Sequence, residues 1–303
     1  NPDHQIRLAA FDWLTRQTQL HGEVLPRKLL EQGFEFQGER VSLVGASGIW
    51  KPRILPEIPL SITTTATGPY EDSFRPDELL EYKYRGTDPM HRDNVGLRKA
   101  MQQRIPLIYF QSEVPGKYAA AWPVYIVGDD PANLTFTVAV DDYAYVKIQP
   151  ELSQQRFNDA EWIGRRAHIT RMVRARLGQQ GFRVRVIDAY QEQCACCRLR
   201  HVELLDAAHI VPHSDPKSEM AVKNGISLCK LHHAAFDSYL FGIRPDHVIE
   251  VREDVRKEKD GPMLIHGLQQ IHDQKIAAPR SIGLAPDPNL LEQRYEIFRS
   301  ARL

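Results

Sequence analysis

Residues 194–213 read CACCRLRHVELLDAAHIVPH, and after a polar loop residues 224–236 read NGISLCKLHHAAF. The apolar run over 204–210 predicts a strand, which a Val-Pro pair ends because proline has no N–H to donate to a sheet. Asn224-Gly225 is typical of a turn between strands, and His233 is expected at the start of a helix. The segment therefore predicts strand, turn and helix arranged around a few polar side chains.

The same segment carries all four cysteines of the chain. Cys194 and Cys197 form a C-x-x-C pair, and Cys229 and His232 form a C-x-x-H pair, with Cys196 left over. Two matched pairs of soft donors are typical of a closed tetrahedral zinc site, which can stabilise a segment too polar for a large core. Clustered cysteines favour a metal site in a reducing compartment over a disulfide scaffold. The alternative interpretation is buried thiols near an unrelated histidine.

His209, Asn224 and His233 are expected to converge from strand, turn and helix. With the motifs H-I-V-P, N-G-I-S-L-C and L-H-H-A-A-F, this constellation resembles the HNH branch of the ββα-metal nucleases over about residues 190–243. The resemblance implies that His209 is the general base and that His233 holds a divalent cation, Mg²⁺ or Mn²⁺. Asn224 would fix the loop or orient the base. Phosphodiester hydrolysis needs such an activated water and a cation to neutralise developing charge.

The sequence departs from that family at Ala208, where many members carry a second metal ligand. Asp206 lies on the same strand face as Ala208 if the strand is regular, so Asp206 is a candidate ligand; His213 is another. Without this ligand, a second interpretation is also open: the domain keeps its fold and binds DNA but no longer cleaves it.

The chain has 303 residues, twice the usual domain length, which predicts two domains. Its 42% hydrophobic and 26% charged residues are typical of a globular protein, and its balance of 39 basic and 39 acidic residues excludes a uniformly basic one. Neither a long apolar run nor a signal-like N-terminus is evident, so we expect a soluble, cytoplasmic protein without membrane contact.

The pattern changes along the chain. Residues 4–20 predict an amphipathic helix, residues 34–148 predict short strands, and residues 158–190 predict helix with a break at Gly178 and Gly181. A final helix over 289–298 is assigned to packing or subunit contact. Residues 161–200 hold nine arginines and three acidic residues. The planar, permanently charged guanidinium group of arginine can bind phosphate oxygens, so this stretch is a candidate contact for the DNA backbone. The alternative is a helix face exposed to solvent. The candidate contacts are Arg165, Arg166, Arg171 and Arg174.

Residues 68–88 read GPYEDSFRPDELLEYKYRGTD. With Ser47 to Pro52 upstream, this stretch resembles the signature of SRA domains, which read 5-methylcytosine by base flipping. The resemblance implies that Tyr70 and Tyr82 sandwich an extruded base. A hydrogen bond to the cytosine amino group would come from Asp72 or from Ser73, onto which an ungapped alignment places the family's acid. The alternative is that these tyrosines pack a β core.

The two resemblances together are those of the bacterial SRA–HNH modification-dependent restriction endonucleases. They imply an α+β protein with an SRA/PUA-like β-barrel-type domain (1–155), an Arg-rich helical linker (156–190) and a zinc-stapled HNH domain (191–303). The implied function is cleavage of double-stranded DNA that carries modified cytosine. Cutting both strands with one site per chain suggests a homodimer in the bacterial cytoplasm. The alternatives are a catalytically inactive zinc-stabilised reader and a less selective or RNA-directed HNH nuclease.

Overall fold

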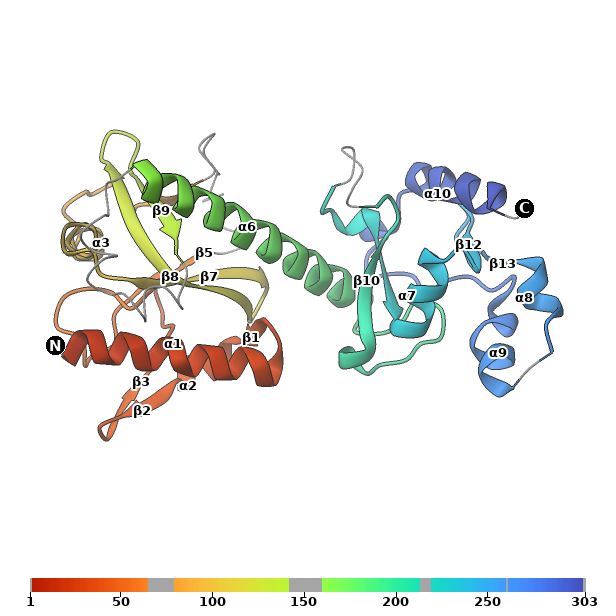
Figure 1. Ribbon diagram of the computed structural model, residues 1–303, viewed down its shortest axis with the longest axis horizontal. Coiled ribbons are helices and arrows are strands. Elements are labelled where there is room, and N and C mark those ends of the chain that lie inside the picture. Colours follow the sequence, from red (N-terminus) through yellow and green to blue (C-terminus); the bar gives the residue numbers. More distant parts are fainter. Residues whose placement is uncertain (1, 65–78, 142–159, 213–218, 260, 302–303) are drawn as a thin grey trace. The chain divides into compact units, whose positions relative to one another are not determined.

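The computed structural model describes residues 2–64, 79–141, 160–212, 219–259 and 261–301. Contacts divide the chain into two compact units, unit 1 (Asn1–Gln180) and unit 2 (Gly181–Leu303). Both units mix helices and strands (Figure 1), so the predicted α+β class is confirmed. Within the described residues, no helix combines the length and apolarity that crossing a bilayer requires.

Unit 1 is organised around one sheet with the strand order β4-β5-β7-β8-β9-β6, and β1 pairs with β8. Neighbouring strands are antiparallel except for the parallel pair β5 and β7. The sheet strands are β1 (Val24–Pro26), β4 (Ile49–Trp50), β5 (Ser61–Thr64), β6 (Leu80–Lys83), β7 (Leu107–Val114), β8 (Lys117–Asp130) and β9 (Thr135–Val140). A separate hairpin comprises β2 (Phe34–Phe36) and β3 (Glu39–Val41).

The sheet of unit 1 curls so that its two edge strands approach each other. The hydroxyl of Tyr82 in β6 donates to the carbonyl oxygens of Gly48, next to β4, and Thr63 in β5, over 3.1 and 3.4 Å. Among the described residues β4 and β6 do not pair through their backbones. The predicted barrel-type domain is therefore an open, curled sheet in the described part of the chain.

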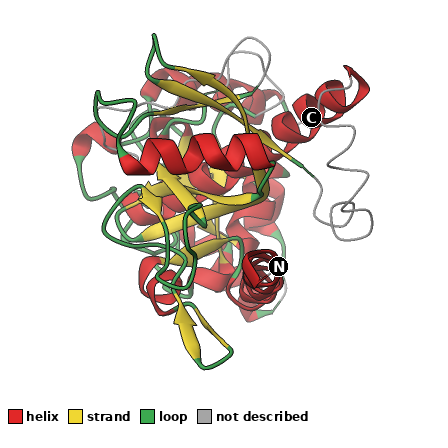
Figure 2. Ribbon diagram, turned by 90° about the vertical axis from the view of Figure 1, so that its left-hand side faces the viewer, coloured by secondary structure: helices red, strands yellow, loops and turns green. Residues whose placement is uncertain are grey.

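Alternating residues of β7 build two cores. Ile108 and Phe110 face one core together with α1, whereas Leu107 and Tyr109 face the other. This alternation follows from the two-residue period of a strand, which lets one sheet bury apolar groups on both sides. Figure 2 shows the sheet flanked by helices. The helices of unit 1 are α1 (Pro2–His21), which confirms the predicted opening helix, α2 (Arg27–Gln32), α3 (Arg92–Gln103) and the first part of α6 (Ala160–Ala189).

Helix α6 continues without a break through Gly178 and Gly181, contrary to the expectation from those glycines. Leu177 packs into the core of unit 1 and Phe182 into the core of unit 2, so burial on both sides of the glycines outweighs their low helix propensity. Residues 160–189 of the predicted linker (156–190) thus form one helix, whose residues are divided between the two units.

Unit 2 contains two hairpins and several short helices around one core. The first hairpin pairs β10 (Leu205–His209) with β11 (Gly225–Cys229), and α7 (Lys230–Asp237) follows directly. The remaining elements are β12 (Phe241–Ile243), β13 (Ile249–Val251), α8 (Glu253–Lys257), α9 (Pro262–Gly267), α10 (Pro288–Ser300) and 3-10 turns at Val202–Leu204, Val222–Asn224, Gln269–Ile271 and Ile282–Leu284. The predicted strand and the helix that carries His233 are confirmed, but α7 begins at Lys230 and not at His233 as expected. Asn224 ends a 3-10 turn directly before β11.

Candidate active site and metal centre

The candidate site is built on the β10–β11 hairpin and on α7. The strand register pairs His209, at the end of β10, with Gly225, at the start of β11. A Cβ on residue 225 would lie 2.5 Å from Cγ2 of Val186 and 2.7 Å from Cζ of Phe182 in α6. Glycine at this position therefore allows α6 to pack directly against the hairpin.

Cys194, Cys197, Cys229 and His232 form one cluster whose ligand atoms all lie within 4.8 Å of one another. The Nδ1 atom of His232 lies 3.1 Å from the sulfur of Cys229 and 3.5 Å from that of Cys194. The opposite ring nitrogen, Nε2, donates to the carbonyl oxygen of Gly267 over 2.7 Å. This bond leaves the lone pair of Nδ1 directed toward the sulfurs, where it can bind a metal ion as the histidine ligands of zinc sites do.

The chemistry of these donors also fits zinc. Hydrogen bonds with Cys194 and Cys229 raise the pKa of the Cys197 thiol. Three thiols in contact do not all ionise unless a positive charge lies among them, and a divalent cation supplies that charge. The predicted set of four ligands is therefore brought together, and Cys196 lies outside it.

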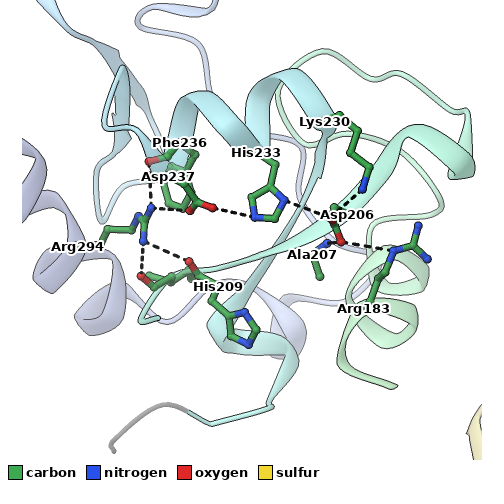
Figure 3. Close-up of polar contacts among 10 residues, drawn as sticks. Arg183, Asp206, Ala207, His209, Lys230, His233, Phe236, Asp237 and Arg294 are labelled. Carbon is green, nitrogen blue, oxygen red and sulfur yellow. Dashed lines mark hydrogen bonds and ion pairs between the residues drawn. The ribbon is translucent and has the colours of Figure 1, made fainter. Parts of the chain in front are cut away.

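A second, partly buried polar cluster lies where β10 faces α7 (Figure 3). His233 lies between two carboxylates: its Nδ1 is 3.4 Å from Oδ2 of Asp206, and its Nε2 is 3.2 Å from Oδ2 of Asp237. Asp206 also forms ion pairs with two cations: Nζ of Lys230 lies 3.0 Å from its Oδ2, and Nε of Arg183 lies 3.4 Å from its Oδ1. The cluster thus offers hard oxygen and imidazole donors of the kind that divalent cations bind.

The electrostatics of this cluster follow from its opposite charges. The hydrogen bond to Asp206, with a further one to Asp237, raises the pKa of His233 to about 9. Burial opposes ionisation of Asp206, but the hydrogen bonds from His233 and Lys230 outweigh it and lower the pKa of that carboxyl. Both carboxylates are therefore charged at neutral pH.

Asp237 was not among the residues expected from the sequence. It follows His233 by four positions, so both side chains lie on the same face of α7. The spacing H-x-x-x-D is the signal that could have identified it. Asp206, in contrast, was expected as a candidate ligand, and it faces His233 as the strand alternation requires.

His209 does not join this cluster. Its ring stacks on Phe182 of α6 with ring centroids 4.0 Å apart and planes at 17°. Figure 3 shows the ring directed away from His233. Since successive strand residues point to opposite faces, His209 takes the face opposite to Asp206 and Ala208. The structure therefore does not direct the side chains of His209 and His233 toward one point, contrary to the prediction from the sequence.

Asn224 is buried and holds the loop that follows β10. Its Oδ1 accepts from the backbone N–H of Val211 at 2.9 Å, and its Nδ2 donates to the carbonyl oxygens of Val211 and Glu219 at 3.2 and 3.0 Å. Its own carbonyl accepts from the N–H of Ile210. Of the two roles expected for Asn224, these contacts correspond to fixing the loop.

Residues 194–244 match the family model described as HNH endonuclease. This segment is an HNH endonuclease domain. A search of solved structures found similarity to a protein named "Modification dependent TagI restriction endonuclease", with 15% identity over 93% of this chain and 89% of that chain and a TM-score of 0.29. A search of curated proteins found no match.

Outside the HNH domain, a cavity of about 270 Å³ opens where the edges of the unit 1 sheet meet. Its lining residues are Ser47, Gly48, Ile49, Thr63, Thr64, Tyr82, Lys83, Tyr84, Arg85 and Gly86. Tyr82 is thus a buried wall residue whose hydroxyl is held by two carbonyls. The other residues expected in a base pocket, Tyr70, Asp72 and Ser73, lie outside the described residues.

The four arginines expected to contact a DNA backbone divide into two pairs. Arg165 and Arg166 both bind the buried carboxylate of Asp141, and only 4% of the Arg166 side chain is exposed. Burial of this ion pair removes Arg166 from any surface that DNA can reach, so that expectation is corrected. Arg171 and Arg174 lie on the exposed face of α6.

Proposed function

We propose that this protein is a divalent-cation-dependent DNA endonuclease that selects double-stranded DNA carrying 5-methylcytosine or a related modified cytosine. The observation that carries the proposal is the HNH endonuclease domain, whose hairpin and helix hold Asp206 and His233 in contact. The selection of modified DNA is supported by the SRA-like sequence of unit 1 and by the cavity beside Tyr82.

In the proposed reaction, Asp206 and Nδ1 of His233 hold the cation, with Mg²⁺ or Mn²⁺ as the candidates. Asp237 binds the other ring nitrogen and so fixes the imidazole, as outer carboxylates do at many metal sites. A bound cation would neutralise charge that develops on the scissile phosphate. Zn²⁺ in the Cys194, Cys197, Cys229 and His232 cluster has a structural role only.

His209 is the proposed general base that takes a proton from the attacking water. Stacking on Phe182 holds its ring plane, and Asn224 holds the loop directly after it. His209 lies on one face of β10, and His233 in α7 contacts Asp206 on the other face. The scissile phosphate is therefore proposed to bind at the end of this strand, within reach of both histidines.

Recognition of the modified base is proposed to occur by flipping into the cavity of unit 1. Extruding a base costs a few kcal/mol, and stacking on an aromatic ring returns about 1–3 kcal/mol per base. Tyr70 and Tyr82 are the proposed stacking partners, with Asp72 or Ser73 bonding the polar edge of the base. Arg171 and Arg174 are proposed to contact the backbone. Each chain has one HNH domain, so cutting both strands is proposed to use a homodimer.

The decisive experiment is digestion of CpG-methylated and unmethylated plasmid with Mg²⁺ or Mn²⁺. We expect the methylated plasmid to be cut preferentially, and His209→Ala to slow cleavage by about 100-fold or more. His201→Ala changes an exposed histidine of the same unit and should cut as wild type does. Equal cutting of both plasmids would favour a less selective nuclease. Selective binding without cleavage by any divalent cation would favour the inactive reader.

A further inference from the structure

Arg294 on α10 lies outside the matched HNH segment, yet its side chain reaches into the candidate site (Figure 3). Only 6% of it is exposed. One terminal nitrogen donates to the carbonyl oxygens of Ile210 at 3.2 Å and His209 at 3.5 Å. The other donates to the carbonyl oxygen of Phe236 at 3.0 Å and to Oδ1 of Asp237 at 3.0 Å.

These contacts join the two segments that carry the proposed chemistry. His209 ends β10 and Ile210 follows it, whereas Phe236 and Asp237 end α7. Asp237 uses one carboxylate oxygen for Arg294 and the other for Nε2 of His233. A continuous chain of polar contacts therefore runs from Arg294 through Asp237 to the imidazole.

Arginine suits this place for geometric reasons. Its planar fork can donate to several acceptors at fixed angles, which the single ammonium of lysine cannot do. The guanidinium carbon also lies over the ring of Phe236, 3.9 Å from its centroid, so a cation–π contact adds to these hydrogen bonds. A buried cation with this many partners sets the orientation of each one.

We propose that Arg294 is a positioning residue for the cation site: it orients the Asp237 carboxylate, which in turn holds His233 toward Asp206. This role rests on the cation site of the proposed function. It assigns the C-terminal helix, which packs against β12 of the HNH segment, a part in catalysis beyond packing.

The test measures Mn²⁺ binding to the zinc-loaded full chain without DNA, by electron paramagnetic resonance of free Mn²⁺. Arg294→Met keeps length and stacking but removes the donors, and it should raise the Mn²⁺ dissociation constant about 10-fold, as loss of an outer-shell partner does. Asp237→Asn should act similarly, and the double variant should be no worse than Asp237→Asn alone. Arg294→Lys should recover part of the loss.

Leu291→Ala is the matched control, since Leu291 is a buried residue on the same helix without polar contact to the site. It should lower the melting temperature but leave Mn²⁺ affinity and kcat unchanged. If Arg294→Met binds Mn²⁺ as well as Leu291→Ala does, Arg294 has only a packing role and the proposal is wrong. A wild-type chain that binds no Mn²⁺ would overturn both the role and the cation site. Normal binding without cleavage would overturn only the nuclease function.

Discussion

Replacing Cys197 by serine is the sharpest test of the zinc centre. Cys197 is the exposed member of the cluster, whereas Cys194, Cys229 and His232 are buried. An exposed Cys→Ser change by itself alters stability by about 0.5 kcal/mol or less. Any larger loss must come from the metal that the thiolate helps to hold.

The expected loss can be worked out from the ligand set. Structural zinc contributes about 10–16 kcal/mol to folding of small domains, so one of four ligands corresponds to about 3 kcal/mol. For a unit of about 120 residues, each kcal/mol shifts the melting temperature by about 4 °C. Cys197→Ser should therefore lower the melting transition of unit 2 by about 12 °C.

The assay combines calorimetry with zinc analysis of the purified full chain. Wild-type protein should hold one zinc per chain, and EDTA should lower its unit 2 transition further than Cys197→Ser does. Cys196→Ser is the control, because Cys196 is adjacent in sequence but outside the cluster, and it should keep both zinc and melting temperature. A Cys197→Ser protein with full zinc content and normal melting would refute the zinc staple.

Three further outcomes are expected. Arg166→Met should destabilise unit 1 by about 3–5 kcal/mol in denaturant titration, because it leaves Asp141 buried with one arginine fewer; an unchanged midpoint would contradict the buried pair. Tyr82→Phe should lower the preference for methylated plasmid about 5-fold through loss of the hydrogen bonds that join the sheet edges, and equal preference would argue against this cavity. In zinc-loaded protein without added Mg²⁺ or Mn²⁺, the ion pairs of His233, whose pKa rises from 6.5 to about 9, should contribute fully below pH 6.5 and fade as pH rises through 9. His233→Gln should flatten that part of the melting profile, and an unaltered profile would contradict it.

The sequence by itself predicted the cluster of Cys194, Cys197, Cys229 and His232, the hairpin and the helix after it. Each ligand pair is only three positions apart, so local backbone geometry brings its two members together. The strand and helix periods placed Asp206 toward α7, and the same periods could have placed Asp237 beside His233. The spacing of apolar residues likewise predicted the opening helix, and the family resemblances implied a mixed α+β protein.

Tertiary packing decided the rest, because it depends on residues far apart in the chain. Strand alternation places His209 on the face opposite to Asp206, but only packing gives it Phe182 as a stacking partner, which no motif encodes. Arg294 donates a hydrogen bond to the backbone carbonyl of His209, which lies 85 positions earlier in the chain. The sequence predicted Arg166 as a surface charge, whereas in the structure it is buried and paired with the carboxylate of Asp141. Spacing along the sequence constrains neighbours within a turn or a strand, whereas burial and long-range contacts are set only when the separate elements pack together.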